Sequence, residues 1–85
     1  MMQKEERSLY GCKVGDQFYI SKIELEGTLR RRLLDLGFVP GAVIEVLQKS
    51  PLGDPVAYRV SNTTIALRKE ESSQIFGTIQ GGEPK

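Results

Sequence analysis

One stretch near the middle of the chain, LRRRLLDLGFVPGAVIEV, constrains the possible folds more than any other. It begins with leucines whose spacings of four and three residues place one apolar stripe along a short helix: Leu29, Leu33 and Leu36. Gly37 follows the stripe directly, and glycine can adopt the left-handed conformation that ends a helix. The pattern therefore predicts a helix over residues 29–36, for which Thr28 is a suitable N-cap.

The residues after this helix indicate a turn and then a strand. Phe38 occupies the position from which a side chain commonly packs back on the helix, here on Leu33. Pro40 and Gly41 cannot continue a helix and form a turn. Residues 42–47 then alternate between two faces, as in a strand. One short helix that leads into a strand, in a chain this small, favours a compact, barrel-like binding module.

The length of the chain limits it to one domain. A chain of 85 residues buries only roughly 60% of its unfolded surface. No apolar run approaches the ~20 residues of a membrane span, and residues 1–8 are too polar and charged for a signal peptide. The single cysteine, Cys12, excludes an internal disulfide. We therefore expect a protein of the reducing cytoplasm with no direct membrane insertion.

Charge and composition exclude several classes of function. Twelve Lys and Arg residues oppose eleven Asp and Glu residues, which argues against non-specific nucleic-acid binding. The chain contains no histidine, the commonest general base and transition-metal ligand. With one cysteine and no histidine, a closed zinc or iron–sulfur site within one chain is not expected. There is no phosphate-binding P-loop motif and no nucleophile–base pair, so we expect no enzyme and no catalytic residues.

Short alternating segments predict the strands of a small sheet. They cover residues 18–25, 42–49, 56–60, 63–67 and 76–79. In the first segment the alternation changes phase at Ser21 and Lys22, which indicates a β-bulge. Asn62 suits the positive φ of a tight turn, and residues 69–75 favour one or two helical turns. The apolar positions predict a core of Leu9, Phe18, Ile20, Leu33, Leu36, Ile44, Val46, Val60, Ile65 and Leu67.

These elements fit a mainly β fold, a small SH3-like barrel of about five antiparallel strands with one or two short helices. The barrel is expected to cover residues 9–79. A flexible leader, residues 1–8, and a flexible tail, residues 80–85, flank it.

Over about residues 9–79 the chain resembles the ferrous iron transport protein A family. The resemblance depends on the order of four motifs: Leu9 with Gly15-Asp16, RLLDLGFVPG at 32–41, PLGDP at 51–55 and IALR at 65–68. It implies an SH3-like barrel that acts beside a membrane-embedded GTPase that moves Fe²⁺. The domain also resembles the C-terminal module of iron-dependent repressors. We find no DNA-binding domain in this chain, which favours the transport interpretation.

Two features are candidates for binding a partner. The first is the margin of the helix, where arginines flank the apolar side chain of Leu34. The alternatives are that the arginines form only a solvated face and that Leu34 belongs to the edge of the core. The second is a loop rich in proline and glycine, which is either a pre-organised binding edge or only a rigid hairpin connection. The candidate residues are Arg30, Arg31, Leu34, Leu52, Gly53, Asp54 and Pro55.

Metal binding by one chain has little support in the sequence. Asp16 and Asp54 carry oxygens that suit a hard cation, but such residues in turns are commonly turn-formers. We interpret Cys12 as a small apolar residue. A single thiolate without further ligands would bind a metal ion only weakly. We expect no metal-ligating residues and no tightly bound cofactor, and at most weak or transient binding of Fe²⁺ or another transition metal.

The first functional hypothesis is an accessory or regulatory protein of bacterial ferrous iron uptake that docks on the cytosolic part of the Feo membrane GTPase. The alternative is a transition-metal-binding sensor or delivery protein with an SH3-like fold. A third is an adaptor that holds a peptide in an aromatic groove, which is weakened because Tyr10, Tyr19 and Tyr58 are scattered. The expected partner is the GTPase, with no nucleic acid and with weak homo-oligomerisation as a further possibility.

Overall fold

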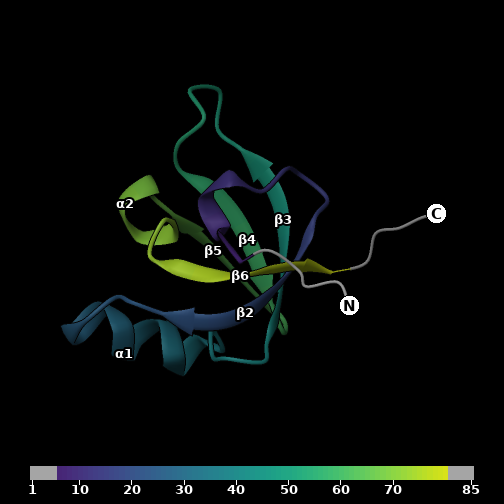
Figure 1. Ribbon diagram of the computed structural model, residues 1–85. Helices are drawn as coiled ribbons and strands as arrows, with labels where there is room; N and C mark the ends of the chain where they lie inside the picture. Colours follow the sequence, from purple (N-terminus) through teal and green to yellow (C-terminus); the bar gives the residue numbers. More distant parts are fainter. Residues whose placement is uncertain (1–5, 81–85) are drawn as a thin grey trace.

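The computed structural model describes residues 6–80, and within them one antiparallel sheet encloses the core (Figure 1). The sheet has six strands in the order β1-β6-β2-β3-β4-β5. The elements are β1 (Arg7–Ser8), the 3₁₀ turn η1 (Leu9–Gly11), β2 (Gln17–Ile23), α1 (Gly27–Leu36), β3 (Val43–Lys49), β4 (Val56–Val60), β5 (Thr63–Leu67), α2 (Lys69–Ser72) and β6 (Ile75–Gln80). The expected mainly β fold with one helix and one shorter helix is confirmed.

The expected boundaries of the domain fall partly outside the described residues. Residues 1–5 and 81–85, which make up most of the expected leader and tail, lie outside them. The sheet begins before residue 9, because Arg7–Ser8 form β1 and pair with Gly77 and Phe76 of β6. Gln80, the first residue of the expected tail, is the last residue of β6 and pairs with Gln17.

Strand β2 connects the two halves of the sheet, because it pairs with β3 on one side and β6 on the other. Its pairing with β6 shifts register between Ile20 and Lys22, which confirms the bulge predicted there. The bulge matters because an extra residue bends a strand and increases its twist. It helps a sheet of short strands to curve around a small core.

The end of α1 has the geometry that its sequence predicts. Gly37 adopts the left-handed conformation, with φ of 112°. The N–H of Phe38 donates to the carbonyl of Leu33 at 2.9 Å, and the N–H of Gly37 donates to that of Leu34 at 3.1 Å. These two bonds satisfy carbonyls that the last helical turn leaves free. Phe38 is fully buried, as expected for a side chain that packs back toward the helix.

The start of α1 differs from the prediction. The helix begins at Gly27 and its N-cap is Glu26, so Thr28 lies within the first turn and does not cap it. Gly27 has φ of 72°, a conformation that glycine adopts without strain. The conformation of Gly27 therefore directs the chain into the helix, and no side chain caps the first turn.

The core contains most of the predicted residues. Eight of the ten are buried, whereas Leu36 and Ile65 are only partly buried and pack against the cluster. Leu36 lies at the last residue of α1, and Ile65 lies on a strand at the edge of the sheet, where cover is incomplete. The buried hydrophobic residues that the prediction did not include are Cys12, Phe38, Val56, Tyr58 and Ile75.

Two local predictions near the end of the chain are wrong in detail. The helix expected over residues 69–75 ends at Ser72, because Ile75 pairs with Ile23 and so begins β6. In the turn after β4, the residue with positive φ is Ser61, at 54°, and not Asn62.

Neither helix of the described part is long and apolar enough to cross a membrane.

Candidate functional site

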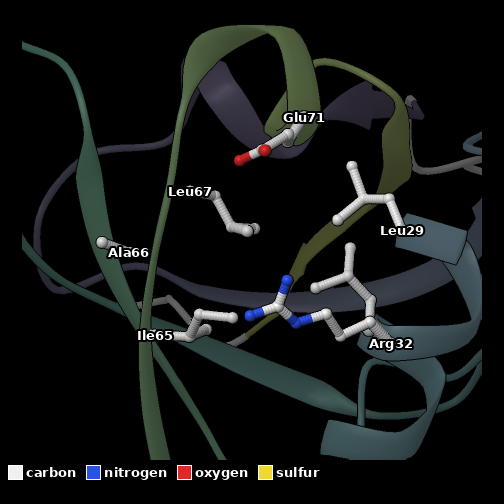
Figure 2. Close-up of a pocket in the computed structure, with 7 residues that line it drawn as sticks. Leu29, Arg32, Ile65, Ala66, Leu67 and Glu71 are labelled. Carbon is white, nitrogen blue, oxygen red and sulfur yellow. The ribbon is translucent and has the colours of Figure 1, made fainter.

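A pocket opens between α1 and β5, with α2 at one end (Figure 2). Its volume is about 250 Å³. It is lined by Leu29, Arg32 and Leu33 of α1, by Ile65, Ala66 and Leu67 of β5, and by Glu71 of α2. We call this feature the α1–β5 pocket. It is smaller than the roughly 300–1,000 Å³ that encloses a drug-sized ligand, and so suits a single side chain.

Three elements form the walls of the α1–β5 pocket. The apolar stripe of α1 faces the core, so Leu33 is fully buried while Leu29 is only partly buried. Strand β5 alternates in the same way, with Leu67 buried and Ala66 exposed. The buried leucines of the two elements therefore contribute an apolar base, and residues of β5 form one side of the pocket.

Two opposite charges flank the opening of the α1–β5 pocket. In Figure 2 the guanidinium group of Arg32 extends over the pocket beside Ile65, and the carboxylate of Glu71 enters from the opposite end, beside Leu67. Arg32 is exposed and forms no ion pair within residues 6–80. Glu71 Oε1 accepts a hydrogen bond from the backbone N–H of Arg68 at 2.8 Å. The arginine is thus available to an acidic group of a ligand.

Three consecutive arginines in the sequence favour a solvated helix face. That interpretation missed the position of Arg32 in the lining of the pocket. A signal for it is present in the sequence. Arg32 follows Leu29 by three residues, a spacing that places both side chains on one side of a helix. The other wall could not be predicted, because it depends on where β5 packs.

The predicted contact residues of α1 are accessible to different degrees. Arg30 and Arg31 are exposed, and Leu34 is half-buried. Leu34 is not among the partly buried residues that pack against the core. Its position is therefore compatible with a contact surface.

The predicted loop contacts divide into one exposed side chain and three that the fold partly encloses. Leu52 is 93% exposed, whereas Gly53, Asp54 and Pro55 are half-buried. The N–H of Gly53 donates to the carbonyl of Ser50 at 2.8 Å, which closes a turn that presents Leu52. Asp54 Oδ1 accepts a hydrogen bond from the N–H of Lys69 at 2.8 Å, so this carboxylate binds the first turn of α2.

The structure does not bring the two predicted patches together. Figure 1 shows α1 at one end of the molecule and the loop between β3 and β4 at the opposite end. The structure also weakens the third hypothesis, an aromatic groove that holds a peptide. Tyr58 is fully buried in the core and cannot line such a groove.

Cys12 occupies an apolar and protected position. Its side chain is 1% exposed, and its Sγ lies 3.9 Å from the carbonyl oxygen of Ser8. Burial, together with the nearby charge of Asp16, raises the pKa of the Cys12 thiol to about 11. The thiolate is the metal-binding and nucleophilic form, and at neutral pH this thiol keeps its proton.

Carboxylates that could hold a cation are engaged elsewhere or dispersed. Asp16 Oδ2 accepts a hydrogen bond from the N–H of Lys13 at 2.8 Å, the turn-forming role expected of it. Within residues 6–80, no three Cys, Asp or Glu side chains gather as metal ligands would.

A family model described as the FeoA domain matches residues 7–79. The chain belongs to the FeoA domain family. The matched region includes α1, β5 and α2, and therefore every residue of the α1–β5 pocket. The resemblance to ferrous iron transport protein A stated from the sequence is confirmed.

One curated relative joins a FeoA domain to a transporter. It is a protein of Porphyromonas gingivalis (strain ATCC BAA-308 / W83), described as an Fe(2+) transport protein A/Fe(2+) transporter FeoB fusion protein. It is 44% identical over 61 residues, which cover 72% of this chain and 7% of the relative. The chain thus spans only a small part of the fusion protein.

Two solved FeoA structures show the same fold. FeoA from Chlorobium tepidum is 35% identical with a TM-score of 0.83, over 91% of this chain and 73% of that chain. FeoA from Stenotrophomonas maltophilia, solved with zinc and described as an SH3 domain protein, is 26% identical with a TM-score of 0.71, over 86% of this chain and 88% of that chain. The SH3-like fold predicted from the sequence is confirmed.

Proposed function

We propose that this chain is an accessory module of ferrous iron uptake that docks on the cytosolic part of the Feo membrane GTPase. The observation that carries this proposal is the fusion relative, in which a FeoA domain and FeoB are parts of one polypeptide. Domains that are joined in one protein and separate in another commonly act together. The FeoA family membership of the chain supports the connection to ferrous iron transport.

The docking surface is expected among residues that are at least partly exposed and belong to firm elements. Arg30, Arg31 and Leu34 lie on α1, and arginine beside an apolar side chain is typical of interface hot spots. Leu52, with Gly53, Asp54 and Pro55, lies on a loop already ordered by internal hydrogen bonds. Ordering costs on binding are therefore small at both patches.

Co-purification of the chain with its Feo membrane GTPase tests the docking. Leu34→Glu and Leu52→Glu each place a charge on one patch, and Val14→Glu is the matched control at another exposed apolar position. We expect one of the first two variants to weaken co-purification and cellular iron uptake while Val14→Glu does not. Thermal unfolding of each variant confirms that the fold is intact.

The opposite positions of the patches make the single variants informative. If only Leu34→Glu weakens association, the partner contacts the α1 end, and if only Leu52→Glu does, it contacts the loop end. Normal association by both folded variants would show that the proposed surfaces are wrong. Failure of the unmodified chain to co-purify would contradict the docking itself.

A further inference from the structure

We propose that the α1–β5 pocket receives an extended peptide segment, which pairs antiparallel with the free edge of β5. The segment carries a basic, an apolar and an acidic residue at alternate positions, in that order. This inference rests on the proposed function, because it names the class of partner segment that the module would hold.

The free edge of β5 is the first observation. β5 is the last strand of the sheet and pairs only with β4. Val60 and Thr63 flank a two-residue turn, and in such a hairpin these residues exchange both backbone hydrogen bonds. Because hydrogen-bonded pairs alternate along an antiparallel ladder, the N–H and C=O groups of Thr64 and Ala66 point away from β4. No other segment among residues 6–80 bonds to these groups.

The α1–β5 pocket beside this edge is the second observation. Ala66 belongs both to the free edge and to the lining of the pocket. When a peptide adds a strand to a sheet, main-chain hydrogen bonds supply affinity and pockets for alternate side chains supply specificity. A volume of about 250 Å³ suits one side chain of such a strand, and the buried Leu33 and Leu67 among the lining residues favour an apolar one.

The charges at the two ends determine the order of residues in the segment. Glu71 lies at the Leu67 end of β5 and Arg32 at the Ile65 end (Figure 2). A segment antiparallel to β5 passes Glu71 first and Arg32 last. Residues that face one side of a strand recur every second position, about 7 Å apart. Leu67 and Ile65 are one such repeat apart, so a central apolar residue enters the pocket between the two charges, and the long basic and acidic side chains two positions before and after it lean back toward Glu71 and Arg32. The complementary pattern is basic–x–apolar–x–acidic.

Titration of the full chain with a synthetic heptapeptide, acetyl-TKTLTET-amide, tests this inference. Binding is measured by NMR, and we expect saturable shifts of the amide signals of Thr64 and Ala66. The charge-reversed peptide acetyl-TETLTKT-amide should bind about tenfold more weakly, a difference of about 1.4 kcal/mol. The peptide acetyl-TKTSTET-amide, which lacks the apolar side chain, should not saturate. Absence of binding by all three peptides would overturn the proposal.

Two variants of the chain locate the contacts. Arg32→Glu should weaken binding of acetyl-TKTLTET-amide by about tenfold and restore it with acetyl-TKTLTKT-amide, whose last charge is now complementary. Ala66→Pro removes one N–H from the free edge, a change that edge strands tolerate, whereas Ala66→Ser keeps the N–H. Binding should be lost with Ala66→Pro and kept with Ala66→Ser. If Ala66→Pro does not fold, the test of the proposal is the comparison of acetyl-TKTLTET-amide with acetyl-TKTLTKT-amide on Arg32→Glu. Unchanged affinity in Arg32→Glu would overturn the proposal.

Competition separates this inference from the docking proposal. Excess acetyl-TKTLTET-amide should release the Feo membrane GTPase from the chain if both are correct. A GTPase that stays bound despite peptide and despite Arg32→Glu would leave the docking intact and overturn the inference. Peptide binding without any association with the GTPase would support the pocket and contradict the docking proposal.

Discussion

Leu33 belongs both to the core and to the base of the α1–β5 pocket. Its side chain is fully buried, and its carbonyl accepts the hydrogen bond that ends α1. Leu52, of the same residue type, is 93% exposed at the tip of a turn. The same side chain therefore stabilises the fold at one position and is available to a partner at the other.

Leu33→Ala is expected to reduce the free energy of unfolding by ~2–5 kcal/mol, the cost of a cavity at a buried leucine. Urea unfolding followed by circular dichroism measures this change. Leu52→Ala is the matched control and should change stability by no more than about 0.5 kcal/mol. A neutral Leu33→Ala variant would contradict the burial of this residue.

Cys12 should make stability depend on pH in the alkaline range. The pKa of its thiol rises from an ordinary 9.0 to about 11 in the folded protein. The folded state therefore keeps a proton that the unfolded state releases, and the resulting stability is complete below pH 9 and is lost as the pH rises through 11. Unfolding measured from about pH 8 to about pH 11 should show a steeper loss in the unmodified chain than in Cys12→Ala. Tyr58, whose pKa is also raised by burial, is present in both proteins. Equal slopes would contradict the prediction.

The elements of the fold are held together by contacts between segments distant in sequence. Asp54, in the loop after β3, accepts the hydrogen bond of Lys69 at the start of α2. Strands β2 and β6 approach closely where Gly77 pairs with Ile20. At Gly77 a Cβ atom would overlap the carbonyl oxygen of Tyr19, so this pairing needs a residue without a side chain.

Gly77→Ala is therefore expected to force β2 and β6 apart. The obstacle is backbone and cannot rotate away, so the cost should reach or exceed about 1–3 kcal/mol, the usual range for overpacking. Thermal unfolding gives the measurement. Gly11→Ala is the control, because a Cβ atom at Gly11 meets no atom within 4 Å. If both variants were equally stable, the close approach of β2 and β6 would be wrong.

The two candidate surfaces, on α1 and on the loop between β3 and β4, lie far apart on the molecule. Its extents are 38 × 29 × 23 Å, with α1 at one end and the β3–β4 loop at the other (Figure 1). The α1–β5 pocket lies on the α1 side, between that helix and β5. Of the three consecutive arginines of α1, Arg32 is the one that lines the pocket.

The isolated chain is expected to bind Fe²⁺ weakly or not at all. It has no histidine, its one thiol is buried, and Asp54 already binds the backbone of α2. Anaerobic calorimetric titration with Fe²⁺ is the measurement. Stoichiometric micromolar binding that is lost in Cys12→Ser or Asp54→Ala would reveal a site at those residues.

Local chemistry determined much of the fold. The bounds predicted for the strands at residues 56–60 and 63–67 match β4 and β5, because alternation and turn residues act within a few positions. The bulge at Ser21 and the end of α1 at Gly37 were predictable for the same reason. Family membership was also predictable, because the order of the motifs is a property of the sequence alone.

Tertiary structure decided the features that depend on how distant segments pack. The burial of Ile75 and the position of Asp54 on α2 follow from pairings that no local pattern contains. The α1–β5 pocket exists because β5 ends the sheet beside α1, which places Arg32 and Glu71 at one opening. The sequence by itself determined the elements, since these depend on neighbouring residues. Only the packed structure decided which of their faces remain open, since that depends on what covers them.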